Sequence, residues 1–213
     1  MDWGKYFKTL IDWKKLPSYR LETRIDSIIG YYLPEIVSHY REVEIIGIIP
    51  EFPIRCLTVD NDYQKGQRSH KADFLLISKE KTNYLVEFKT DLNSCKKKQD
   101  DYYKATKDIK LGALIHGIRS IYKATKSKNK YNHLINKLKY LLLIDDNFNF
   151  IGTNEKIEII YIQPSKNNED DKEDGIHIIN FNEISEWLKK KQDIDDFEKE
   201  LCEALSEWGK EDK

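Results

Sequence analysis

The sequence predicts an α/β fold in which a central mixed β-sheet is flanked by helices. Apolar residues recur at helical spacing over residues 20–40, and three strand-like segments rich in β-branched and aromatic residues follow. Further helical segments then precede two more strand-like segments near the end of the chain. This order of helix, three strands, helices, and two strands with helices is typical of α/β architecture with a mixed sheet.

The first predicted element is a helix over residues 20–40, whose buried stripe includes Ile25, Ile29, Leu33 and Ile36. Gly30 and Pro34 weaken this helix locally, so we expect it to kink or end there. The segment 43–56 is apolar and β-branched, which predicts a buried strand with a bend from Pro50 to Pro53.

The segments ADFLLI and YLVEF, separated by a polar connection, predict a β-hairpin. Helices are expected over residues 94–108, 109–126 and 131–143. Two more strands are expected over 156–162 and 176–181, and two amphipathic helices finish the chain.

The length of 213 residues predicts one domain, with a core at about 20–180 and a helical C-terminal extension at 181–213. No apolar run approaches the roughly 20 residues that span a bilayer, and the first residues lack the apolar region of a secretion signal. We therefore expect a cytoplasmic protein without a membrane partner. Three widely spaced cysteines argue against a disulfide framework. The oligomeric state stays open.

The formal net charge of −1 conceals a strong segregation of charge along the chain. Residues 94–140 carry 13 basic and 3 acidic side chains, whereas residues 141–213 carry 9 basic and 20 acidic ones. A polyanion would be attracted to the first segment and repelled by the second. Charge alone fits a solvated lysine-rich helix face equally well.

The hairpin geometry predicts a cluster of charged side chains. In an antiparallel pair, opposed residues have a constant index sum, and Asp73 and Glu87 sum to 160, which places the turn at Glu80 in the polar connection. Lys89 lies two residues beyond Glu87 and therefore shares its face, while Phe88 points into the core. Two carboxylates and one ammonium should meet on one face.

Adjacent carboxylates repel each other unless a cation or a proton is present. A site made of oxygen ligands suits Mg²⁺, which could activate a water molecule and offset the charge of a phosphate undergoing attack. A neighbouring lysine could orient that water or stabilise the transition state. The alternative is a solvated strand face with a cross-strand ion pair.

These residues resemble the motif of the PD-(D/E)XK nuclease superfamily. Its acid on one strand corresponds to Asp73 in KADFLL, and its acid-x-Lys corresponds to Glu87, Phe88 and Lys89 in LVEFKTD. The family proline is replaced by Ala72. Downstream, QDDYY over residues 99–103 is similar to the Q-x-x-x-Y motif of the RecB-like branch. The resemblance implies a restriction-endonuclease-like core.

The resemblance also implies a deoxyribonuclease that depends on Mg²⁺ or Mn²⁺. Asp73 and Glu87 would bind the metal, with the Phe88 carbonyl as a further ligand, and Lys89 would assist the attacking water. The family commonly adds an acid from the helix before the sheet, for which Glu22 is preferred to Asp26. Further residues expected to position or bind the substrate are Gln99, Tyr103, Lys96, Lys97 and Lys98. Glu51, in the bend of the first strand, is a weaker candidate for the site.

Two other functions fit the sequence. A nucleic-acid-binding module could keep the fold without cutting, and a protein-interaction domain could use the acidic C-terminal segment. The intact motif residues favour the enzyme. The sequence does not distinguish DNA from RNA, or endonuclease from exonuclease.

Overall fold

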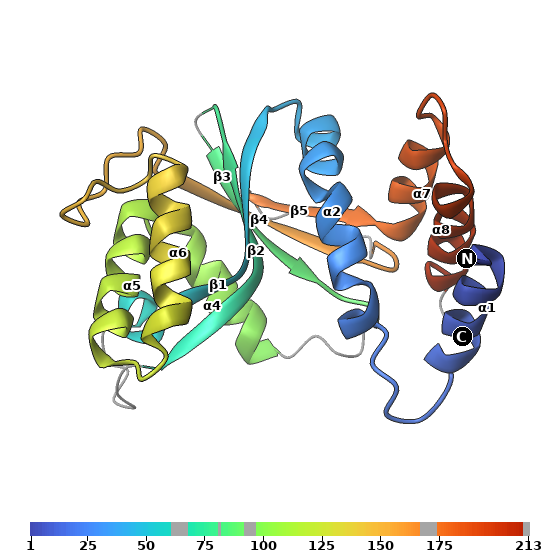
Figure 1. Ribbon diagram of the computed structural model, residues 1–213, viewed down its shortest axis with the longest axis horizontal. Helices are drawn as coiled ribbons and strands as arrows, with labels where there is room; N and C mark the ends of the chain where they lie inside the picture. The colour runs from blue at the N-terminus through green and yellow to red at the C-terminus, as the bar shows by residue number, and fades with distance from the viewer. Residues whose placement is uncertain (61–67, 81, 92–96, 167–173, 211–213) are drawn as a thin grey trace.

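The computed structural model confirms an α/β fold with a mixed sheet (Figure 1). It describes residues 1–60, 68–80, 82–91, 97–166 and 174–210, with the side chains of 97–100 left out. The five strands lie side by side in chain order: β1 (Ile45–Arg55), β2 (Ser69–Ser78), β3 (Thr82–Phe88), β4 (Lys156–Gln163) and β5 (Ile176–Asn180). The pairs β1–β2 and β2–β3 are antiparallel, whereas β3–β4 and β4–β5 are parallel.

Helix α2 (Glu22–Arg41) covers one face of the sheet, as the periodicity over 20–40 predicts (Figure 1). Ile25, Leu33 and Ile36 are fully buried against strand residues such as Phe74 and Val86. The helix continues through Pro34, contrary to the expectation that it could end there. Its packing against the sheet over five turns outweighs the hydrogen bond that a proline removes.

The other face of the sheet carries the shorter helices α4 (Lys97–Lys107), α5 (Leu111–Ala124) and α6 (Lys128–Tyr140), together with the single turn α3 (Cys56–Val59). The first three correspond to the predicted helices at 94–108, 109–126 and 131–143. Helix α6 starts and ends three residues earlier than predicted. Leu142, just beyond it, has a φ of +54°, a left-handed conformation in which the helix cannot continue.

Helix α1 (Trp3–Lys14) was not predicted, because only Phe7 and Leu10 of its residues are buried and its apolar stripe is therefore short. It packs against α8 (Asp196–Trp208), which follows α7 (Phe181–Lys189). The ring centroids of Trp3 and Phe197 lie 4.9 Å apart. Both chain ends therefore lie in one helical layer beyond the sheet (Figure 1).

The helices α7 and α8 were predicted, and each begins with a capping box formed by Asn180 and Glu183 or by Asp195 and Glu198. Their apolar faces join the same core as α2. In the described ranges no helix is long and apolar enough to cross a membrane. Cys56 and Cys202 are buried free thiols, and Cys95 lies outside the described residues.

Candidate functional site

The β2–β3 hairpin has the register predicted from residue numbers. Phe74 faces Val86 and Leu76 faces Tyr84, so Asp73 and Glu87 follow as the next pair. At that point the backbone ladder gives way to a side-chain contact, because the Asp73 Oδ2 accepts a hydrogen bond of 2.7 Å from the Phe88 N–H. The carboxylate of Asp73 is thereby fixed between the two strands.

Glu87 and Lys89 are both buried, with 2% and 7% of their surfaces exposed. The Lys89 ammonium donates to Glu87 Oε1 and forms an ion pair with it. The Lys89 backbone N–H donates to the carbonyl of Ile162 on β4 at 2.8 Å, which anchors the end of β3. Such charges are rarely buried unless they are paired or functional.

The electrostatics of this cluster are strongly perturbed. Burial and the neighbouring Glu87 carboxylate raise the pKa of Asp73 from 3.8 to about 7. Burial also raises the pKa of Glu87, against the opposing effects of Lys89 and Tyr103. Burial alone would lower the pKa of Lys89, but the adjacent Glu87 carboxylate raises it above its ordinary value. The fold therefore holds negative charge where ionisation is costly.

Glu22, the first residue of α2, reaches the same electrostatic cluster from the other side of the sheet. Burial raises its pKa, Lys89 lowers it, and Asp73 raises it further. Asp26, the alternative, accepts a 2.6 Å hydrogen bond from the Ser27 N–H and so turns toward its own helix. Of these two acids, Glu22 interacts with both Asp73 and Lys89.

Tyr103 of α4 lies next to the cluster and contacts the hairpin that carries it. Its side chain is 1% exposed, and its hydroxyl donates to the Lys71 carbonyl at 2.6 Å. The same hydroxyl reaches the Glu87 carboxylate, whose pKa it lowers. The buried hydroxyl thus links α4 to both strands of the hairpin. The expected substrate-binding residues Lys96, Lys97, Lys98 and Gln99 have side chains outside the described residues.

Glu51 lies on β1 beside Asp73, between the pairs Pro50–Phe74 and Phe52–Ala72. Its φ of +53° marks the expected bend, and its exposed carboxylate forms an ion pair with Lys71. Glu51 also raises the pKa of Asp73, which places it in the electrostatic surroundings of the cluster.

A metal ion would have to use few protein ligands here. Among the residues that the structure describes, no group of three or more His, Cys, Asp or Glu side chains could hold one. Mg²⁺ commonly binds through one or two carboxylates and keeps several waters, so a set limited to Asp73, Glu87 and the Phe88 carbonyl suits it chemically. Burial and the nearby Glu87 carboxylate raise the pKa of Asp73, and a divalent cation bound by both carboxylates would relieve the repulsion between them.

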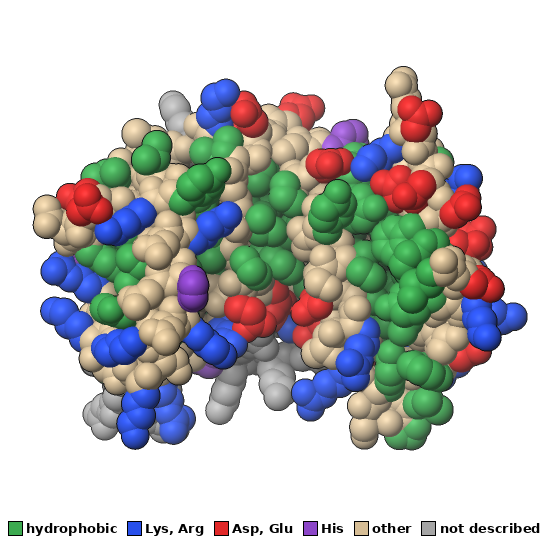
Figure 2. All heavy atoms as spheres, viewed as in Figure 1, with side chains coloured by type: hydrophobic (Ala, Val, Ile, Leu, Met, Phe, Trp, Pro, Cys, Tyr) green, Lys and Arg blue, Asp and Glu red, His purple; other side chains and the backbone are tan. Residues whose placement is uncertain are grey.

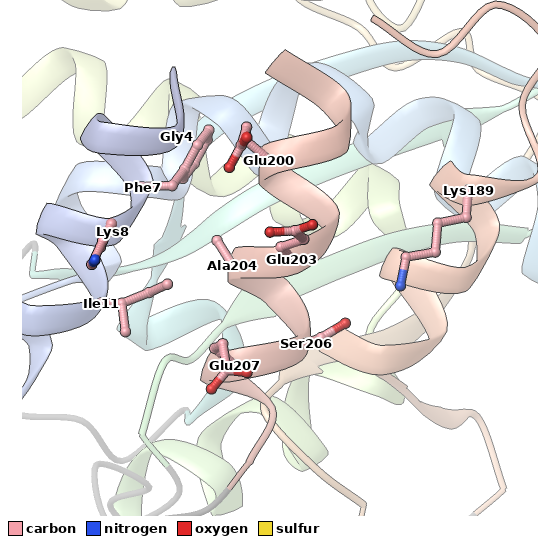
Figure 3. Close-up of a pocket in the computed structure, with 10 residues that line it drawn as sticks. All are labelled: Gly4, Phe7, Lys8, Ile11, Lys189, Glu200, Glu203, Ala204, Ser206 and Glu207. Atoms are coloured by element: carbon pink, nitrogen blue, oxygen red, sulfur yellow. The ribbon is translucent and has the colours of Figure 1, made fainter. Parts of the chain in front are cut away.

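A cavity of about 510 Å³ lies elsewhere, between α1 and α8 (Figure 3). Both lysines and glutamates line it, and none of the residues around it belongs to the cluster: Gly4, Phe7, Lys8, Ile11, Lys189, Glu200, Glu203, Ala204, Ser206 and Glu207. The perturbed titratable groups and this cavity are therefore separate features.

The sequence did not indicate that α6 approaches the cluster. Tyr131 of α6 is hydrogen-bonded with Ser69 and lies beside Lys71, at the start of β2. Burial raises the pKa of this tyrosine. Because Lys71 precedes Asp73 by two residues, the first turn of α6 stands near the site. Pairing between distant segments of this kind leaves no periodic signal in the sequence.

No protein-family model, curated protein or solved structure matches this chain significantly. The resemblance to the PD-(D/E)XK nucleases consequently stays an expectation based on the residues of the motif.

Proposed function

We propose that this protein is a divalent-metal-dependent nuclease of the PD-(D/E)XK type that hydrolyses phosphodiester bonds in DNA. The observation that carries the proposal is the convergence of Asp73, Glu87 and Lys89 where β2 and β3 separate. The perturbed pKa of Asp73, about 7, supports it, because titratable groups shifted by burial and charge partners cluster at functional sites.

Asp73, Glu87 and the Phe88 carbonyl would hold Mg²⁺ or Mn²⁺. When bound, such an ion lowers the pKa of a water molecule and offsets charge on the phosphate. The Phe88 N–H keeps the Asp73 carboxylate oriented, and the Lys89 ammonium does the same for Glu87. Both carboxylates are therefore presented in fixed positions, which lowers the cost of organising the site.

Lys89 would supply a positive charge from the protein in addition to that of the metal ion. Its ammonium is paired with Glu87 in this structure and has a raised pKa, so it is charged at neutral pH. Close to a phosphate it would donate hydrogen bonds to the attacking water or to a non-bridging oxygen. Glu22 is the additional acid that would complete the site.

A direct test incubates the purified protein with linear, circular and single-stranded DNA, with Mg²⁺, Mn²⁺ or a chelator. We expect cleavage of at least one substrate that requires the metal and is abolished by Asp73→Ala. Absence of cleavage in all combinations, or undiminished cleavage by the variant, contradicts the proposal. DNA binding without cleavage would favour the alternative of a non-catalytic nucleic-acid-binding module.

The assignment of Glu22 gives a sharper prediction. Glu22→Gln should lower the cleavage rate by roughly tenfold to a hundredfold, because it removes a carboxylate that interacts with both Asp73 and Lys89. Asp26→Asn, one helical turn away, is the matched control and should stay within about twofold of the wild type. Single-turnover cleavage rates measure both. Equal losses in the two variants would remove Glu22 from the site.

A further inference from the structure

The outer face of helix α6 has an unusual composition. Its exposed residues from 128 to 137 are all Lys, Asn or His: Lys128, Asn129, Lys130, Asn132, His133, Asn136 and Lys137. Tyr140 is exposed at the last position of the helix. The opposite face, with Leu134, Ile135 and Leu138, packs on the core below the sheet. The helix thus presents a surface of hydrogen-bond donors that contains no carboxylate.

This surface belongs to a long segment without acids. Residues 109–144 carry eight Lys or Arg and no Asp or Glu, whereas a chain with 37 acids in 213 residues would place about six in a segment of this length. Figure 2 shows the consequence, with basic side chains gathered over the α5–α6 end of the molecule and acidic ones over α7 and α8. The exposed residues of α8 are mostly acidic: Asp196, Lys199, Glu203 and Glu207.

The positive charge of the outer face is not balanced locally. Within the described part of the chain, the ion pairs of this segment join Lys110 to Glu155 and Lys139 to Asp146. Neither Lys130 nor Lys137 pairs with a described carboxylate, and both are exposed, with Lys137 above the Tyr140 ring. These two lysines lie seven residues apart, two helical turns along one side of α6.

The outer face also stands close to the candidate site. Tyr131, on the first turn of α6, is hydrogen-bonded with Ser69 and adjacent to Lys71, two residues before Asp73. A strand of nucleic acid whose phosphate lay at Asp73 would pass Lys71 and reach the lysines of α6. The 13 residues of α6 span about 20 Å, a length that covers roughly six phosphates of one B-DNA strand.

We infer that the outer face of α6 binds the phosphate backbone of duplex DNA beside the bond that is cut. The inference depends on the proposed nuclease function and identifies the surface that would hold the substrate at the same site. A duplex fits better than a single strand, because single-strand platforms use several aromatic side chains for base stacking, whereas the exposed residues of α6 other than Tyr140 are Lys, Asn and His, which provide donors to phosphates.

The test measures binding of a 30-base-pair duplex by fluorescence anisotropy in a chelator, which prevents cleavage, at several salt concentrations. The double variant Lys130→Gln/Lys137→Gln should bind roughly tenfold more weakly at 50 mM salt. Its slope of log affinity against log salt should be lower by about 2, since each phosphate contact contributes about 0.9. The matched control Lys190→Gln/Lys199→Gln, at the acidic end, should bind like the wild type.

Several results would overturn the inference: no duplex binding by the wild type, an unchanged salt slope in the α6 variant, or an equal loss in the control. A loss confined to a single-stranded 30-mer would overturn the duplex assignment. Thermal midpoints of both variants, expected within about 2 °C of the wild type, exclude unfolding as the cause. The proposed nuclease function fails separately, if wild-type protein binds the duplex through α6 and never cuts it.

Discussion

Asp73 is the residue on which the site is centred. It is held by a backbone N–H, faces Glu87 across the hairpin, and interacts with Lys89 and Glu51. One partly buried carboxylate thus combines a fixed position with an unfavourable charge. Functional sites commonly keep such groups at a cost in stability.

This cost gives a prediction for Asp73→Asn. Between pH 4 and pH 7 the folded protein retains a proton on Asp73 that the unfolded chain has released, so the free energy of unfolding falls as the pH rises through this window. Asparagine cannot ionise and can still accept the Phe88 hydrogen bond. The variant should be more stable than the wild type at pH 8, by the order of 1–3 kcal/mol, while losing activity.

Urea unfolding at pH 4 and pH 8, in a chelator, measures the effect. The difference between variant and wild type should be close to zero at pH 4 and should favour the variant at pH 8. A variant that is less stable than the wild type at pH 8, or a difference that does not depend on pH, would show that the ionised Asp73 carboxylate does not destabilise the folded protein.

At the scale of elements, α2 and the β2–β3 hairpin position the site together. Gly30 allows this contact, because a Cβ there would lie 2.7 Å from Phe74 Cε1. Phe74 is the strand partner of Val86 in the hairpin. Phe74 also follows Asp73 directly in the chain. Close packing of α2 on the hairpin therefore fixes the strand that carries the carboxylate.

Gly30→Ala should destabilise the protein by about 1–2 kcal/mol. Alanine favours the helix by about 1 kcal/mol, but displacing the Phe74 ring in a packed core costs more. Because Phe74 adjoins Asp73, cleavage should also slow. Ser27→Ala, at an exposed position of the same helix, is the control and should change stability by less than about 0.5 kcal/mol. A neutral or stabilising Gly30→Ala would contradict this packing.

Most elements were predictable from the sequence because their apolar patterns are regular. The helix at 20–40, the hairpin register and the existence of the two later strands follow from apolar patterns and index sums, whereas the parallel pairing of these strands comes from the structure. The continuity of α2 through Pro34 was not predictable, because tertiary packing decides it. The C-terminal end of α6 was also missed, since Leu142 adopts a left-handed conformation although no glycine or asparagine stands there to predict it.

For the candidate site, the sequence indicated that Asp73, Glu87 and Lys89 converge, and it preferred Glu22 to Asp26. The contact of Tyr103 with Lys71 and the approach of Tyr131 to Ser69 depend on how α4 and α6 dock on β2. Such contacts between distant segments are set by the whole fold, so local patterns carry no information about them.

At the scale of the molecule, the two ends have different roles. The end that carries α5 and α6 is rich in basic side chains and adjoins the site, whereas at the other end of the molecule the exposed residues of α8 are mostly acidic (Figures 1 and 2). A polyanion approaching this molecule would be oriented by the resulting field, with α6 toward it and α8 away.

The helical layer should contribute stability rather than chemistry. Phe7 is 1% exposed and packs against Phe197 and Trp208, so Phe7→Ala should lower the free energy of unfolding by about 3–5 kcal/mol. The cleavage rate of the folded protein at 20 °C should stay unchanged. Lys8→Ala, the exposed neighbour, controls for the helix itself. A stable variant with a slow rate would indicate that α1 acts on the site.

Calorimetric titration with Mn²⁺ at pH 8 tests most directly whether the carboxylates of the hairpin form a metal centre. We predict one binding event in the wild type, its loss in both Asp73→Asn and Glu87→Gln, and its retention in Asp26→Asn. Absence of binding in the wild type, or binding that survives the removal of either hairpin carboxylate, would contradict the account.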